Sequence, residues 1–165
     1  MFDLVNARAI AMAVRDYNQV LREVARVLRP GGLFISCEWA TYPAFEPSLQ
    51  LDPAIHALPL LQRRGLQTIA PLVPSFLEGA GAFVGISAAQ HNVPIGAWPT
   101  DPSLRSIGAA CLQANVRYAE SVKPFLLDSG WTAANVDTMV EEYVQEIESL
   151  NGLVSVLYTV HARRA

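Results

Sequence analysis

The sequence predicts an α/β fold, in which helices and strands alternate along the chain. An amphipathic helix begins at Asp16, ends at Pro30-Gly31-Gly32 and leads into the apolar run Leu33 to Cys37. Such a run is typical of a strand covered on both faces of a mainly parallel sheet. A second, strongly periodic helix leads into an alternating, β-branched segment, Leu153 to His161, which indicates a last strand. These two helix–strand units predict a sheet with flanking helices.

Composition limits the classes of protein that fit. The chain has 165 residues, 52% of them hydrophobic and 16% charged, against about a quarter charged in an average domain. We therefore expect one domain over residues 1–165, with some apolar surface intended for a partner. The net charge of -3 and the absence of clustered Lys and Arg argue against nucleic-acid binding.

Localisation follows from what the sequence lacks. No stretch reaches the ~18 apolar residues of a membrane helix, and no basic-then-apolar leader begins the chain. Cys37 and Cys111 lie among apolar neighbours, which is the setting of inert buried thiols. We expect a cytoplasmic or nuclear protein in a reducing compartment, without a membrane partner.

The first third of the chain has clear start and stop signals. Phe2 to Val5, with Asp3 embedded, fits the end of a buried strand. Asp16 is a good helix cap, with Gln19 three residues on as its capping-box partner. An apolar stripe then follows the helix: Val20, Leu21, Val24, Ala25, Val27 and Leu28.

The sequence signals for helices and strands after residue 40 are less regular. Residues 41–80 are rich in proline and predict a broken helical insert or lid, with a helix within Leu66 to Glu78 that ends at Gly79 and Gly81. Ala82 to Ala89 reads as a strand. Asp101-Pro102 predicts the start of a long helix that ends before Pro124, and Thr132 predicts the cap of the next one.

The order of these motifs resembles a known family. FDLV, then NAR, then a helix, RVLRPGG and LFISCEW are similar to the second, C-terminal half of class I S-adenosylmethionine-dependent methyltransferases. NVPIGAWPTDPSLRSIG and VSVLYTVHARRA resemble a fungal subgroup of small-molecule and secondary-metabolism methyltransferases. The resemblance implies a partial Rossmann-like sheet, in which four strands of this chain match strands 4-5-7-6 of the order 3-2-1-4-5-7-6. The chain would then be a truncated form that lacks strands one to three.

The resemblance also implies a cofactor, S-adenosylmethionine, and residues near it. Asn6, Ala7 and Arg8 follow the first strand, where the family places groups near the methionine end of the cofactor. The alternative is that Asn6 and Arg8 turn the chain and contact solvent. No G-x-G stands between an apolar strand and a helix, since Gly79-Ala80-Gly81 leads into a strand instead.

Two further positions are candidates for substrate contact. Glu38 and Trp39 sit at the carboxyl end of the Leu33–Cys37 strand, where ligands of open α/β sheets bind. Glu38 could orient or deprotonate a nucleophile, as a weak catalytic candidate; the alternative is a solvated Glu beside a core Trp. Trp98 could line a substrate mouth or anchor its Pro-Gly loop.

Other chemistry fits poorly. His56, His91 and His161 match no HxxH or HExxH spacing, so no metal site is predicted. No G-x-S-x-G elbow is present, which argues against a hydrolase.

Two functions remain open. One is a methyltransferase, as a fragment or truncated form, that acts on a small molecule or a protein. The other is a non-catalytic, methyltransferase-like protein that works by binding or dimerisation. In either case an open edge on the first strand favours association, most simply a homodimer.

Overall fold

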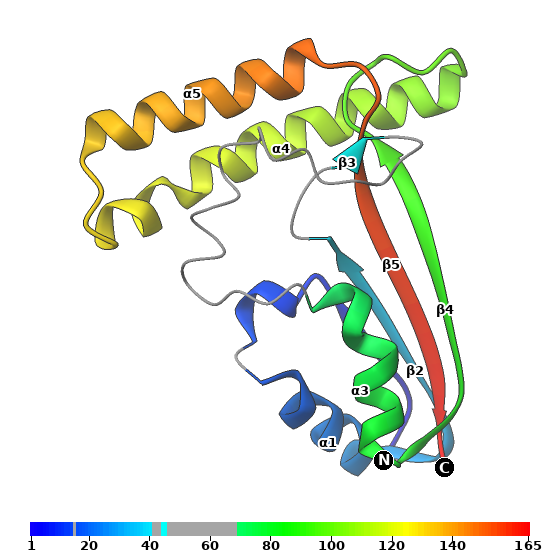
Figure 1. Cartoon of the computed structure of the whole chain (residues 1–165). Helices are drawn as coiled ribbons and strands as arrows, with labels where there is room; N and C mark the ends of the chain where they lie inside the picture. Colours follow the sequence, from blue (N-terminus) through cyan, green and yellow to red (C-terminus); the bar gives the residue numbers. More distant parts are fainter. Residues whose placement is uncertain (15, 41–43, 46–68) are drawn as a thin grey trace. The chain divides into compact units, whose positions relative to one another are not determined.

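The computed structural model describes residues 1–14, 16–40, 44–45 and 69–165. The described chain forms two compact units (Figure 1). The first comprises residues 1–41, 66–91 and 156–165, and the second comprises residues 42–65 and 92–155. The single domain that the sequence predicts over residues 1–165 stays a prediction. Most of the expected insert over residues 41–80 lies outside the described residues.

A mixed sheet and two helices build the first unit. β1 runs parallel to β2, β2 runs antiparallel to β5, and β4 pairs with β5. The sheet follows the order β1-β2-β5-β3, where β3 is Ala44–Phe45, and β4 pairs with β5 off this path. An α/β fold with a mixed sheet is thus confirmed, and the match to strands 4-5-7-6 of the family stays a prediction. The elements are β1 (Phe2–Arg8), η1 (Ala11–Ala13), α1 (Tyr17–Val27), β2 (Leu28–Trp39), η2 (Ala70–Leu72), α3 (Val73–Ala80), β4 (Phe83–Pro94) and β5 (Leu153–Arg164).

The strands are longer than the apolar patterns predict. The expected end of the first strand at Val5 is wrong, because pairing with β2 continues to Arg8 opposite Cys37. Asn6, Ala7 and Arg8 therefore lie within β1 instead of after it. Strand pairing uses only backbone N–H and C=O groups. A strand can therefore continue beyond the apolar side chains from which it is predicted in the sequence.

The helix signals of the first unit are confirmed in part. Asp16 caps α1 and accepts hydrogen bonds from the backbone N–H of Asn18 at 2.9 Å and of Gln19 at 3.3 Å. α3 ends at Gly81, in the left-handed conformation that suits glycine. The expected end at Gly79 is wrong, since that residue lies inside α3.

The core of the first unit lies between the sheet and its helices (Figure 1). Alternate β2 side chains point into this core, and Phe34, Ser36 and Glu38 are all buried. The intervening side chains lie on the other face of the sheet, where Ile35 is half-buried and Trp39 is exposed. Fully buried apolar side chains of the core include Leu21, Leu28, Phe34, Val73, Leu77 and Ala162.

Two long helices and a short strand form most of the second unit. Asp101 and Thr132 cap these helices as predicted, through hydrogen bonds from Ser103 and Leu104 and from Asn135. The expected stop before Pro124 is wrong, because the first helix continues to Asp128. The elements are β3 (Ala44–Phe45), which pairs antiparallel with the first residues of β5, α4 (Pro102–Asp128) and α5 (Ala133–Ser149).

The core of the second unit explains why Pro124 does not end α4. Leu126 and Val136 are both buried in a cluster between α4 and α5. Lys123 pairs with Glu120 on its own helix and with Asp137 on α5. Burial beyond the proline offsets the hydrogen bond that its ring removes.

Two remaining expectations concern thiols and membranes. Cys37 and Cys111 are free thiols, and both are half-buried instead of fully buried. In the described ranges, no helix has the length and hydropathy needed to cross a membrane.

Gly108 permits a close backbone contact in the second unit. Its carbonyl accepts a hydrogen bond from the Gly96 N–H at 3.0 Å. A Cβ at Gly108 would lie 2.1 Å from the Gly96 carbonyl oxygen. Only a residue without a side chain fits there.

We expect Gly108→Ala to lower the free energy of unfolding by roughly 1–3 kcal/mol, because backbone must move to admit the methyl group. The matched control is Gly79→Ala in α3, where a Cβ meets no atom within 4 Å. That variant should gain about 0.5–1 kcal/mol through helix propensity. Chemical denaturation of both variants measures the difference, and equal stabilities would contradict the assignment.

Candidate functional site

The candidate site is the end of the sheet where the parallel strands β1 and β2 finish. Ligands of open α/β sheets bind at the carboxyl ends of strands. Directly after β1, the Ala9 N–H donates to the Cys37 carbonyl at 2.9 Å. Ala9 has a φ of 52°, which is uncommon for a residue with a side chain. The backbone thus turns sharply here and enters η1.

Glu38 holds this turn. Its side chain is buried, with the residue 1% exposed. One carboxylate oxygen accepts from the Ile10 N–H at 3.3 Å, and the other accepts from the Ala11 N–H at 3.1 Å. Burial raises the pKa of the Glu38 carboxyl, and the two backbone donors act in the opposite direction. Glu38 therefore connects the end of β2 to the turn that follows β1.

Tyr17 and Ser36 lie in the same core. The Tyr17 hydroxyl and the Ser36 hydroxyl are 2.9 Å apart, and both residues are buried. Burial raises the pKa of Tyr17 to about 12, so the phenol stays neutral at physiological pH. The Tyr17 ring also stacks on Phe76 of α3, with centroids 6.2 Å apart. We call Tyr17, Ser36 and Glu38 the buried polar cluster.

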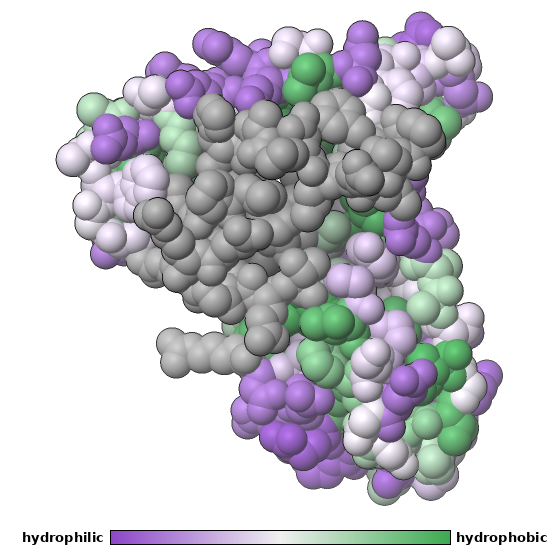
Figure 2. Space-filling view, in the orientation of Figure 1, coloured by the Kyte–Doolittle hydropathy of each residue, from purple (hydrophilic) through white to green (hydrophobic). Residues whose placement is uncertain are grey.

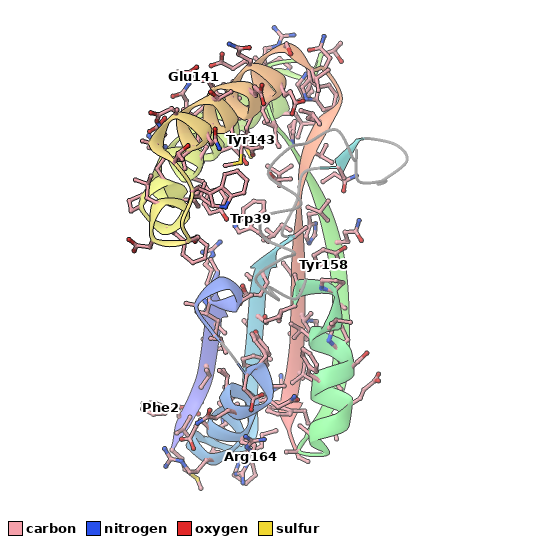
Figure 3. All side chains as sticks on the ribbon, turned by 60° about the vertical axis from the view of Figure 1, so that its left-hand side comes forward. Phe2, Trp39, Glu141, Tyr143, Tyr158 and Arg164 are labelled. Carbon is pink, nitrogen blue, oxygen red and sulfur yellow. The ribbon has the colours of Figure 1, made fainter. Side chains whose placement is uncertain are left out.

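The structure changes the interpretation of Glu38 and Trp39. The predicted alternative, a solvated Glu beside a core Trp, is wrong, because Glu38 is buried and Trp39 is 43% exposed. The two side chains belong to opposite faces of β2, since successive residues of a strand alternate. Trp39 stands at the end of β2 (Figure 3). Contact of either side chain with a substrate stays a prediction.

The three predicted cofactor residues divide between the two faces of β1. Ala7 is buried in the core of the first unit, so only its backbone is available to a ligand. Asn6 and Arg8 are exposed, and they pair in register with Ile35 and Cys37 of β2. An amide and a guanidinium therefore share the open face near the carboxyl end of the sheet. Their contact with a cofactor stays a prediction.

Trp98 belongs to the second unit. Its indole Nε1 donates to the Leu153 carbonyl at 3.1 Å, and the Ile95 N–H donates to the same carbonyl at 2.8 Å. The indole is half-buried. These contacts support the predicted role of Trp98 as an anchor for its loop, and a place in a substrate mouth stays a prediction.

The two histidines in the described ranges, His91 and His161, belong to no candidate metal centre. Within the described ranges, no group of three or more His, Cys, Asp or Glu side chains could hold a metal ion. His91 is exposed, and its Nε2 lies 3.1 Å from the Thr159 hydroxyl. His161 is also exposed, and His56 lies outside the described residues.

Sequence reasoning did not find Tyr17 and Ser36. Ser36 gave a weak signal as the one hydroxyl within the apolar run of β2. A buried hydroxyl needs a hydrogen-bond partner. Tyr17, the first residue of α1, supplies it across 19 positions of chain.

The comparisons with known proteins agree with this fold. A family model described as "Methyltransferase domain" matches residues 1–36, which include β1, α1 and most of β2. Residues 1–36 of this chain are therefore similar to a methyltransferase domain.

Two fungal proteins are similar to this chain in sequence. The chain is 24% identical over 147 residues to methyltransferase pytC of Aspergillus terreus. This alignment covers 82% of this chain and 44% of pytC. It is 29% identical over 179 residues to the secondary metabolism regulator laeA of Coprinopsis cinerea, covering 99% of this chain and 44% of laeA. The chain thus spans less than half the length of these relatives.

Solved structures show the fold. Two structures of phosphoethanolamine N-methyltransferase 2 from Haemonchus contortus superpose with TM-scores of 0.51 and 0.50. Each is 15% identical, and each match covers 99% of this chain and 33% of that protein.

We expect Glu38→Gln to destabilise the first unit by about 1–3 kcal/mol, because the amide offers one acceptor oxygen to two backbone donors. The control is Glu23→Gln on α1, an exposed partner of Arg26, which should change stability by less than about 0.5 kcal/mol. Urea unfolding of both variants provides the measurement. Equal midpoints would contradict the assigned role of Glu38.

The pH dependence of this difference has a definite sign. A carboxyl whose pKa is raised on folding binds its proton more tightly in the native state. The stability advantage of the wild type over Glu38→Gln should therefore shrink as pH rises above about 4.3, the ordinary Glu value, and level off above the folded pKa of Glu38. Unfolding curves at several pH values check this, and an advantage that grows over the same window would contradict it.

Proposed function

We propose that this chain takes part in S-adenosylmethionine-dependent methyl transfer and that the carboxyl end of β1 and β2 contributes to the cofactor and acceptor site. The observation that carries the proposal is the turn after β1. Glu38 fixes that turn through two backbone hydrogen bonds, directly beyond the exposed side chains of Asn6 and Arg8. Similarity to a methyltransferase domain over residues 1–36 suggests the cofactor class.

The residues at this end fit the amino-acid part of the cofactor. The Arg8 guanidinium suits a carboxylate, and the Asn6 amide can donate to a carboxylate or accept from an ammonium group. When bound, S-adenosylmethionine supplies a methyl group on a sulfonium centre. The sequence has no G-x-G turn between a strand and a helix, so we assign no residue to the adenosine part.

Glu38 serves this function as a positioning residue in our proposal. Both of its oxygens accept from backbone N–H groups, and its burial directs it into the core. Methyl transfer depends strongly on the alignment of donor and acceptor, so a rigid turn contributes without a dedicated base. The acceptor we propose is a small molecule or a protein nucleophile.

The second candidate is a non-catalytic methyltransferase-like protein that acts by association. The exposed apolar side chains of β1, Phe2 and Leu4, favour it. Cofactor binding separates the two candidates.

Isothermal titration calorimetry with S-adenosylmethionine and S-adenosylhomocysteine tests the first proposal. We expect binding that Arg8→Ala weakens by about tenfold, or 1.4 kcal/mol, since the carboxylate of the cofactor would lose its guanidinium partner. Arg22→Ala on α1, whose exposed side chain pairs with Asp16, is the matched control and should leave affinity unchanged. No detectable binding by the intact chain would reject autonomous catalysis and favour the second candidate.

A further inference from the structure

The Tyr17 hydroxyl joins α1 to β2 inside the core of the first unit. It lies 2.9 Å from the Ser36 hydroxyl, and Tyr17 is 3% exposed and Ser36 is 1% exposed. Ser36 and Glu38 are two residues apart on β2, and both are buried. Residues at this spacing in a strand share one face of the sheet. The Tyr17 phenol therefore meets the face of β2 that carries the Glu38 carboxylate.

The contacts of Tyr17 give its O–H group a direction. Burial raises the pKa of Tyr17 to about 12, so the proton stays on the oxygen at physiological pH. A hydrogen bond with Ser36 acts to lower this pKa, whereas a hydrogen bond with Glu38 acts to raise it. A donor stabilises the phenolate, and an acceptor stabilises the neutral phenol. Ser36 thus donates to Tyr17, and Tyr17 donates to Glu38.

We propose that Tyr17 is a positioning residue for the turn after β1 and acts on this turn through the Glu38 carboxylate. The two carboxylate oxygens accept from the backbone N–H groups of Ile10 and Ala11. A carboxylate has about four acceptor sites, so the Tyr17 hydroxyl can bind beside these two donors. Donors on both sides fix the orientation of the carboxylate. The link from this turn to a cofactor rests on the proposed function.

The Tyr17 hydroxyl also favours the ionised form of Glu38. Burial raises the pKa of this carboxyl, and the N–H groups of Ala11 and Ile10 and the Tyr17 hydroxyl oppose that rise. An ionised carboxylate accepts at both oxygens, whereas a protonated one uses one oxygen to carry its proton. Tyr158, in register opposite Glu38 on β5, is a further titratable group on this face. Tyr17 thus keeps Glu38 in the form that can bind both backbone donors.

Two local constraints hold the Tyr17 ring in place. Tyr17 is the first residue of α1, directly after the capping residue Asp16. Its ring stacks on Phe76 of α3, with centroids 6.2 Å apart. A contact must offset the entropy of ordering its groups, and packing already orders this ring. The hydroxyl is therefore available to Glu38 at little additional entropic cost.

Nuclear magnetic resonance of the intact chain tests the proposal without a cofactor. A pH titration follows the side-chain carboxyl carbon of Glu38 and the backbone amides of Ile10 and Ala11. We expect these signals to shift with one midpoint, because both amides donate to that carboxylate. Tyr17→Phe should move the midpoint to higher pH, since the ionised carboxylate loses a donor. An unchanged midpoint in this variant would overturn the proposal.

The matched control is Tyr143→Phe in the second unit. Tyr143 is also a buried tyrosine, and its hydroxyl donates to the side-chain oxygen of Asn115 at 3.2 Å. This variant should leave the midpoint unchanged, and a midpoint that moves equally in both variants would also overturn the proposal. Tyr17→Phe keeps the ring that stacks on Phe76, so the comparison isolates the hydroxyl.

A measurement on the wild type does not depend on how Tyr17→Phe folds. The ring signals of Tyr17 should shift with the same midpoint as the Glu38 carboxyl carbon, because the hydroxyl donates to that carboxylate. Separate midpoints for the ring and the carboxyl would contradict the proposal.

Cofactor affinity tests the step from the turn to the proposed function. At neutral pH we expect Tyr17→Phe to bind S-adenosylhomocysteine about threefold more weakly than the wild type, and Tyr143→Phe to bind it equally well. Equal affinity of Tyr17→Phe and the wild type would reject that step. If the wild type does not bind this ligand, the proposed function fails, and the titration still decides the role of Tyr17.

Discussion

The hydrogen bonds between Glu38 and the turn after β1 are the constraint on which the first unit depends. A buried carboxylate is costly unless its oxygens find donors, and Glu38 finds two at the backbone of Ile10 and Ala11. These donors lie where the chain leaves β1 and starts toward α1. The bonds therefore close the β1–α1–β2 unit at its carboxyl end, where the parallel ladder itself stops.

The other members of the buried polar cluster, Tyr17 and Ser36, connect β2 to the helices. Tyr17 begins α1 and bonds to Ser36, two residues before Glu38 on the same face of β2. Its ring stacks on Phe76, which belongs to α3. Tyr17 thus links the sheet to both helices, through a hydroxyl contact with Ser36 and a ring stack on Phe76. A ligand at this end would meet a turn whose backbone is already ordered, which lowers the entropic cost of binding.

Much of the fold could be predicted because helix caps and apolar patterns act between residues close in sequence. The rest could not, because it depends on contacts between residues far apart in the chain. Asp16, Asp101 and Thr132 were identified as caps because a cap acts on residues two or three positions away. The burial of Glu38 was missed because its hydrogen-bond partners lie 27 and 28 residues earlier in the chain. Its place at the carboxyl end of a strand was visible in sequence, and its direction into the core was not.

The errors at element ends have the same origin. The ladder with β2 carries β1 past Val5 to Arg8, and packing against α5 carries α4 past Pro124. In both cases a neighbouring element outweighs the local preference of the sequence. Asn6 and Arg8, which were predicted to follow the strand, lie within it, and their contact with a cofactor stays a prediction.

The structure shows where the many apolar side chains of this sequence lie. A chain with 52% hydrophobic and 16% charged residues either builds a large core or leaves apolar side chains outside it. The first unit does both, because one face of its sheet packs on α1 and α3 while Phe2 and Leu4 remain exposed at the edge. Figure 2 shows hydrophobic and hydrophilic patches interspersed on the visible surface, so hydropathy alone does not single out an interface.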